Sequence, residues 1–130
     1  MEITTKDFGL GAHLICLTNK AGDTLSLSNY GARIVDWTVN GKKIVLGFDS
    51  TQEYVEKDNY PGATIGRTAG RIKDGQVKIA GKNVQLQQNE AAQTLHGGQD
   101  SFESKLWQFE VFQEAEQAKV QFYLTSNDGE

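Results

Sequence analysis

Apolar and polar residues alternate with a period of two along most of this chain. Leu25 and Leu27, for example, are separated and followed by serines. Successive side chains of a β-strand point to opposite faces, so each alternating run predicts a strand with one buried and one solvated face. The runs that show this pattern, or a short apolar equivalent of it, are 14–18, 24–28, 35–39, 77–80, 84–86, 107–111 and 120–124.

Turn-forming residues separate these runs. Asn40 and Gly41 follow one strand directly, and both readily adopt positive φ, as the two-residue turn of a β-hairpin requires. The segment Ala80–Asn83 predicts a second hairpin turn. No convincing amphipathic helix is present, and Thr51–Lys57 predicts only one short helical turn.

The whole pattern predicts an all-β fold with antiparallel strands, most simply an antiparallel β-sandwich. A length of 130 residues fits one domain, and no repeat, low-complexity tract or linker divides the chain. The stretch from Phe48 to Ala92 has fewer clean strands and more glycine than the rest. Loops of this kind commonly carry function on a rigid scaffold.

Composition excludes several classes of protein. Hydrophobic residues make up 38% and charged residues 23%, which are values of a globular protein. Apolar runs are too short to span a membrane, and Met1–Asp7 lacks the apolar core of a signal peptide. Cys16 is the single cysteine, so the chain can form no internal disulfide. These features predict a cytoplasmic protein without a membrane partner.

The net charge and the spacing of possible metal-binding side chains bear on which partners and cofactors the chain could bind. The net charge of −4, from 13 basic and 17 acidic residues, argues against a nucleic-acid partner. Two distant histidines, one cysteine and scattered carboxylates give no metal-ligand spacing, so no metal is expected. We also expect no cofactor, because the glycine-rich segment 66–70 lacks the lysine and the following helix of a phosphate-binding loop.

The most informative segment is Gly66–Ile72, which is followed by Leu95–Gly98. Together they place an arginine, Arg71, and one of the two histidines among glycines. A guanidinium offers five donors in a rigid fork, which suits the hydroxyls and ring oxygen of a sugar. The residues alone leave a structural alternative open, in which Arg71 satisfies loop carbonyls or pairs with Asp74 or Glu90.

His96 precedes two glycines, which allow a ligand or another backbone to approach closely. Its structural alternative is that the imidazole only fixes the loop. His13, at the start of an early strand, is expected to be a surface or edge residue. Tyr60 and Phe102, in loops near these segments, are candidates for stacking on the ring of a bound ligand. The strand aromatics, by contrast, are expected to pack in the core; they are Trp37, Trp107, Phe109 and Phe122.

Six segments in a fixed order resemble the amino-terminal part of the aldose 1-epimerases, the galactose mutarotase family. Each piece is weak alone, but the order and spacing make a specific pattern that covers nearly the whole chain. The segments are Ser28–Val35, Val45–Asp49, Tyr60–Arg67, Gly70–Ile72, Asn89 with Thr94–Gly98, and Trp107.

The resemblance implies a galactose mutarotase-like supersandwich, of which residues 1–130 would be the amino-terminal part of a single domain. Ser126–Glu130 resembles the beginning of a longer family motif, so we expect a chain truncated at the C-terminus. The implied activity is interconversion of the α and β anomers of free aldohexoses such as galactose and glucose. The family's catalytic acid and base would lie beyond Glu130, so the isolated chain is expected to be inactive or nearly so.

The resemblance also implies site residues. Arg71, His96 and Gly70 correspond to substrate-binding positions, and His96 would have a secondary catalytic role. Gly70 departs from the commoner asparagine, so any sugar contact from this position must come from the backbone, water or another residue.

Three alternatives stay open at this point. One is a non-catalytic carbohydrate-binding or sugar-sensing β-sandwich. Another is a relative of the hexose-phosphate epimerases, in which Arg67 and Lys73 would meet the phosphate, although Arg67 is expected to hold the strand-to-loop turn. The third is physical: uncovered strand edges of a fragment would predict self-association.

Overall fold

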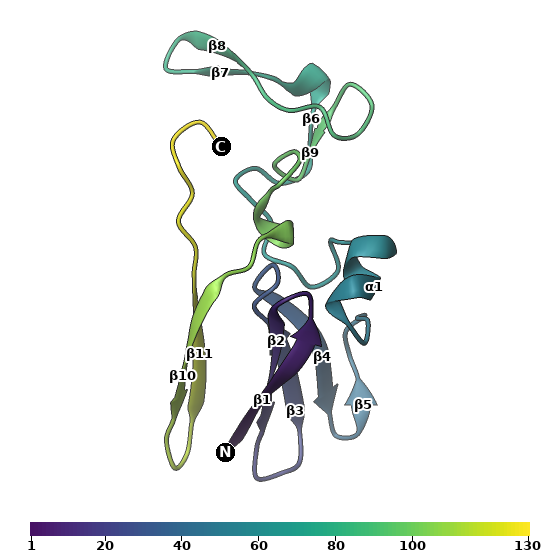
Figure 1. The fold of residues 1–130 in the computed structure, drawn as a ribbon, viewed down its shortest axis with the longest axis vertical. Helices are drawn as coiled ribbons and strands as arrows, with labels where there is room; N and C mark the ends of the chain where they lie inside the picture. Colours follow the sequence, from purple (N-terminus) through teal and green to yellow (C-terminus); the bar gives the residue numbers. More distant parts are fainter.

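Antiparallel strands are the main secondary structure of the computed structural model, which describes residues 1–130 (Figure 1). The predicted all-β antiparallel class is therefore confirmed. Five consecutive strands form the main sheet in their sequence order. These strands are β1 (Glu2–Gly9), β2 (Ala12–Thr18), β3 (Thr24–Ser28), β4 (Arg33–Val39) and β5 (Lys42–Lys43).

The turn between β4 and β5 has the geometry that its residues predict. Asn40 and Gly41 have φ values of 50° and 75°, which is the left-handed conformation that a tight hairpin needs at both positions. The Asn40 amide also donates to the Asp23 carboxylate at 2.8 Å, which ties this turn to the loop before β3.

Strand β1 has no counterpart among the predicted runs. It pairs with β2 from Glu2 opposite Thr18 to Gly9 opposite Ala12. Its central residues are polar and exposed on both faces, so the alternation on which the prediction rested is missing. Pairing with β2, and burial of Phe8 at the far end, fix this edge strand instead.

The remaining strands form three separate pairs: β6 (Arg71–Ile72) with β9 (Thr94–Leu95), β7 (Gln76–Ile79) with β8 (Lys82–Gln85), and β10 (Gln108–Gln113) with β11 (Ala118–Tyr123). Short 3-10 turns occupy Lys73–Gly75 and Phe102–Ser104. The turn between β7 and β8 is shorter than predicted, because Lys82 and Asn83 already belong to β8.

The single α-helix, α1 (Thr51–Glu56), confirms the predicted helical turn. Ser50 caps it, since the Ser50 hydroxyl accepts from the Glu53 amide at 3.2 Å and so satisfies an otherwise free donor. The helix contributes the fully buried Tyr54 to the core. No helix is both long and apolar enough to cross a membrane.

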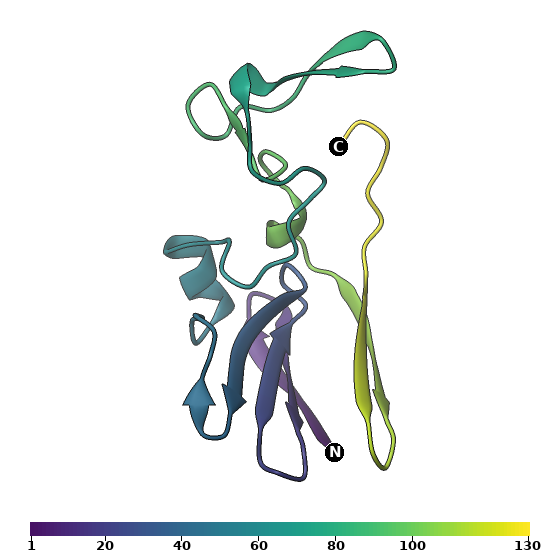
Figure 2. The same ribbon diagram turned by 180° about the vertical axis from the view of Figure 1, so that it is seen from behind.

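The molecule is elongated (Figures 1 and 2). The main sheet lies at one end, the β10–β11 hairpin runs alongside it, and β6, β7, β8 and β9 lie at the other end. The Lys20–Glu116 ion pair, at 2.7 Å, and the contact of the His13 ring with Phe109 join the hairpin to the sheet. His13 is exposed, as expected for a surface residue.

The largest apolar cluster lies on the face of the main sheet that packs against α1, whereas the buried Ile15 and Leu17 of β2 lie on the opposite face. The cluster consists of Phe8, Ala12, Leu14, Tyr30, Val35 and Tyr54, with Cys16 and Phe48 packed against it. The expectation that Trp37 lies in the core is wrong, because its side chain is 40% exposed. Ile44 and Leu46, after the β5 edge, are also exposed, and self-association through such edges stays a prediction.

Candidate functional site

The two-residue ladder between β6 and β9 brings the predicted site residues together. Arg71 pairs with Leu95, and Ile72 pairs with the buried Thr94. One step further along the chain, the His96 amide donates to the Gly70 carbonyl at 3.0 Å. The register therefore places Arg71 and His96 next to each other at the end of this ladder.

Gly70 and His96 also contact each other through a second hydrogen bond. The Gly70 amide donates to Nδ1 of the His96 ring at 3.0 Å. On its other side the imidazole packs against the ring of Tyr60, with a centroid distance of 4.9 Å and an angle of 60°. Gly70 therefore contacts His96 through its backbone, and its expected part in sugar binding stays a prediction.

Tyr60 remains a neutral phenol in this position. Burial, and secondarily the carboxylates of Glu103 and Glu90, raise the pKa of its hydroxyl. Arg33 holds the loop that carries Tyr60. The Arg33 guanidinium donates to the carbonyls of Asn59 and Pro61, at 3.1 Å and 3.5 Å, on either side of the tyrosine.

Arg71 forms a bidentate ion pair with Glu90. Its Nε lies 2.5 Å from Oε1 of the carboxylate and its Nη2 lies 3.0 Å from Oε2. Of the two partners that the sequence left open, the structure selects Glu90 over Asp74. The pair uses one edge of the guanidinium, so the Nη1 donors remain available to a ligand.

This pair predicts a specific pH dependence. Hydrogen bonds from Arg71, with a smaller contribution from its charge, hold the pKa of Glu90 below its ordinary value of 4.5. A carboxyl with a depressed pKa contributes stability above its unfolded-state pKa and loses it as the pH falls through the folded-state pKa. We therefore expect the pair to open only below pH 4.5.

Carboxyl-detected NMR titration of the chain should show Glu90 titrating below 4.5, and the midpoint should return toward that value in Arg71→Ala. Glu53 is the control, because Lys57 lowers its pKa independently of Arg71. An unchanged Glu90 midpoint in Arg71→Ala would show that the pair is not formed in solution.

Arg67 has a different role from the one expected. Its Nε and Nη2 donate to the Ser126 hydroxyl at 3.0 Å and 2.8 Å, and Nη2 also donates to the Asn127 carbonyl. The side chain therefore joins its loop to the segment after β11 and does not hold its own turn. These donors are already in use, which weighs against Arg67 as a phosphate ligand.

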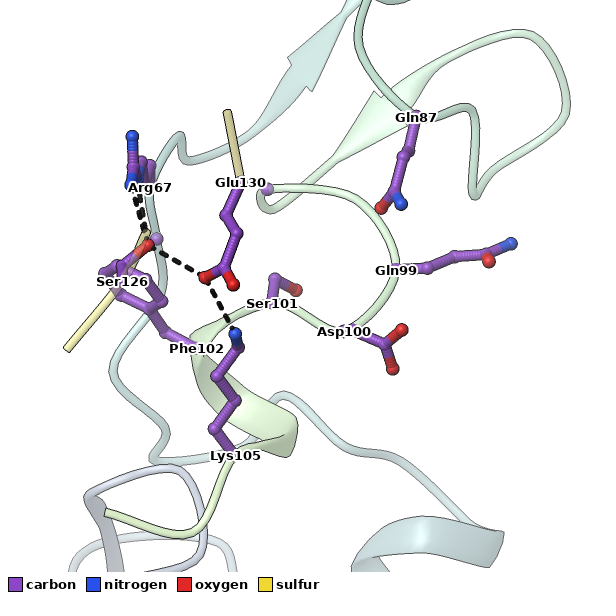
Figure 3. Close-up of a pocket in the computed structure, with 11 residues that line it drawn as sticks. Arg67, Gln87, Gln99, Asp100, Ser101, Phe102, Lys105, Ser126 and Glu130 are labelled. Atoms are coloured by element: carbon purple, nitrogen blue, oxygen red, sulfur yellow. Dashed lines mark hydrogen bonds and ion pairs between the residues drawn. The ribbon is translucent and has the colours of Figure 1, made fainter. Parts of the chain in front are cut away.

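A polar cavity of about 220 Å³ lies beside this contact (Figure 3). Its lining includes Gly66, Gly97 and Phe102 but neither Arg71 nor His96. Lys105, at the cavity's edge, donates to the Glu130 carboxylate at 3.0 Å, so its charge is also compensated. The cavity borders the β6–β9 site without containing its donors.

Comparison with known proteins places this chain in a family. The sequence profile described as aldose 1-epimerase matches residues 13–130. The chain belongs to the aldose 1-epimerase family. An aldose 1-epimerase of Lactobacillus helveticus is 31% identical over 110 residues, which cover 85% of this chain and 84% of that protein.

Other relatives are much longer than this chain. The galactose mutarotase of Mus musculus is 40% identical over 87 residues, which cover 67% of this chain and 24% of that protein. The crystal structure of a galactose 1-epimerase from Lactobacillus acidophilus NCFM superposes with a TM-score of 0.87 at 28% identity. That superposition covers 99% of this chain and 40% of the other.

Sequence reasoning missed two supports of the site. Tyr60 was a candidate for stacking on a ligand, which stays a prediction, and its contact with the His96 ring was not foreseen. Arg33 stood out only as part of a family segment, although it is fully buried. Its position in an alternating strand looks like that of any other residue, so the sequence carries no sign of its role.

Proposed function

We propose that this chain supplies a sugar-binding part of an aldose 1-epimerase site, and that the protein interconverts the α and β anomers of free aldohexoses such as galactose and glucose. The observation that carries the proposal is the β6–β9 register, which places Arg71 and His96 at adjacent positions of two paired strands. Membership of the family supports the class of reaction.

The reaction opens and recloses the sugar ring. A base removes the proton of the C1 hydroxyl while an acid protonates the ring oxygen; the C1 end rotates, and the reverse transfers close the other anomer. Each positioned proton transfer contributes about 10²–10⁴-fold to the rate. We propose that this acid and base are not among residues 1–130, and that His96 takes a secondary part.

Arg71 contributes charge and direction in this scheme. The guanidinium is permanently protonated, and pairing with Glu90 raises the pKa of Arg71 further. Its free Nη1 donors would bind sugar oxygens and stabilise negative charge that develops during ring opening. The hexose-phosphate alternative receives less support, because the donors of Arg67 bind Ser126 and Asn127.

The binding step can be tested on the 130-residue chain. Galactose should shift the amide resonances of Gly70, Arg71 and His96 in an NMR titration. Arg71→Ala should weaken binding about tenfold or more, since a hydrogen bond to a charged group contributes ~1.5–3 kcal/mol. Lys78→Ala, on the exposed β7 strand, is the matched control and should bind as the unmodified chain does. Equal affinity of the Arg71→Ala and Lys78→Ala variants would contradict the proposed site.

The turnover step needs a separate comparison. Polarimetry should show that freshly dissolved α-galactose equilibrates at close to the uncatalysed rate in the presence of the 130-residue chain. The equilibration should be much faster with the product of the whole reading frame in which this sequence occurs. Rapid turnover by the 130-residue chain would refute the claim that the acid and base lie elsewhere. Galactose binding without turnover in both proteins would favour the non-catalytic module.

A further inference from the structure

The two ring nitrogens of His96 have different surroundings. Nδ1 lies 3.0 Å from the backbone nitrogen of Gly70. A backbone N–H can only donate a hydrogen bond, so Nδ1 must accept it and cannot itself carry a proton. In a neutral imidazole the single proton then resides on Nε2, which makes Nε2 a donor.

The same two residues hold each other through a second bond, which fixes the plane of the ring. The His96 amide donates to the Gly70 carbonyl, while the Gly70 amide donates to the His96 ring. His96 has a φ of 49°, an uncommon left-handed conformation that turns its side chain back toward position 70. Backbone geometry at position 70, not a side chain there, therefore sets the orientation of the imidazole.

Tyr60 closes the remaining side of the ring. Its aromatic ring contacts the imidazole at a centroid distance of 4.9 Å. Arg33 holds the carbonyls before and after this tyrosine, so Tyr60 is fixed through the protein interior. A half-turn of the His96 ring about its Cβ–Cγ bond, which would put Cδ2 in the place of Nδ1, would have to displace this packed tyrosine.

We propose that Tyr60 and the backbone of Gly70 are positioning groups that lock His96 as the neutral tautomer with its proton on Nε2. His96 then acts as a hydrogen-bond donor toward an oxygen of the bound ligand and not as a proton acceptor. This last step rests on the proposed sugar-binding function, whereas the locked tautomer does not. The contact needs no side chain at position 70, so a glycine there is compatible with it.

The tautomer can be measured without any sugar. Long-range ¹H–¹⁵N correlation of the ¹⁵N-histidine-labelled chain at pH ~8.5, about two units above the ordinary histidine pKa, observes neutral rings. His96 should show the full separation between a bare Nδ1 and a protonated Nε2. The exposed His13 should show averaged shifts, because a solvated ring exchanges between tautomers. Averaged shifts at His96, or a proton on its Nδ1, would overturn the proposal.

Three variants test the positioning groups. Tyr60→Phe keeps the ring and should preserve the His96 signature, whereas Tyr60→Leu should move its nitrogen shifts toward the averaged pattern of His13. Gly70→Asn should preserve the signature, because asparagine tolerates a left-handed backbone and a Cβ at position 70 meets no atom within 4 Å. An unchanged signature in Tyr60→Leu would remove Tyr60 from the proposal, and a lost signature in Gly70→Asn would contradict the backbone mechanism.

Addition of galactose separates this inference from the proposed function. A sugar-dependent shift of the His96 Nε2 resonance would support both. A locked tautomer whose Nε2 resonance does not respond to galactose would support the positioning mechanism and contradict sugar binding. A galactose response with an averaged tautomer would support sugar binding and contradict the positioning mechanism.

Discussion

Replacing Arg33 by methionine should lower the free energy of unfolding by about 3–5 kcal/mol, because each buried polar group left without its partner costs ~1–3 kcal/mol. Arg33 is fully buried. Its Nε donates to the Tyr30 carbonyl at 2.6 Å, and its Nη2 donates to the Glu103 carbonyl at 2.7 Å. Methionine fills much of the volume but leaves these acceptors without this donor.

Aromatic packing adds to the expected loss. The Arg33 guanidinium lies over the ring of Tyr54 at 4.1 Å and near the ring of Tyr30 at 4.9 Å. Burial lowers the pKa of the guanidinium, and the neighbouring rings and carboxylates oppose this shift. A desolvated cation held by carbonyls and aromatic faces cannot be replaced by an apolar chain without loss.

Urea unfolding followed by circular dichroism measures this effect. The matched control is Lys20→Met, which removes an exposed cation from the Lys20–Glu116 pair and should cost less than about 1 kcal/mol. Arg33→Lys should also be clearly destabilised, since one ammonium cannot reach carbonyls on three different segments. Equal stability of Arg33→Met and Lys20→Met would show that the buried contacts contribute little.

The sequence predicted those strands whose residues alternate between apolar and polar. β3, β4, β10 and β11 all do so, and in β11 the burial alternates as well, with Ala118, Val120 and Phe122 more buried than their neighbours. β1 breaks this rule, since Thr4, Thr5, Lys6 and Asp7 are all exposed. An edge strand without a strongly apolar face is defined by its hydrogen bonds to a neighbour, and a pattern within the strand cannot reveal them.

The residues of the candidate site also divide into those that the sequence predicted and those that it did not. Arg71, His96 and Gly70 belong to compact segments, and a short ladder was enough to bring them together. Glu90 and Tyr60 reach the site from loops, through contacts that depend on the paths of those loops. Asp74 is closer to Arg71 in the sequence than Glu90 is, yet it lies in a turn with a φ of 56°, and Glu90 forms the ion pair. No periodicity in the sequence encodes that choice.

Gly97 should be the least replaceable backbone position of the site. A Cβ at Gly97 would lie 2.3 Å from the Gly66 carbonyl oxygen and 3.0 Å from the Ser101 side chain. Its φ of 92° is also strained for any other residue. We expect Gly97→Ala to lose about 2–5 kcal/mol, of which ~1–2 reflects the left-handed backbone and ~1–3 the overpacking.

Gly70→Ala separates these two contributions. Gly70 has a similarly left-handed φ of 73°, but a Cβ there meets no atom within 4 Å, so only the backbone cost of about 1–2 kcal/mol applies. Urea unfolding should therefore give a clearly lower free energy of unfolding for Gly97→Ala than for Gly70→Ala. The clash should also push the 96–97 backbone away from Gly66, so Gly97→Ala should shift the His96 ring resonances while Gly70→Ala leaves them nearly unchanged. Equal losses of stability in the two variants would mean that the backbone relieves the close approach of Gly66 and Gly97 at little cost. The loop that carries His96 would then be less rigid than we propose.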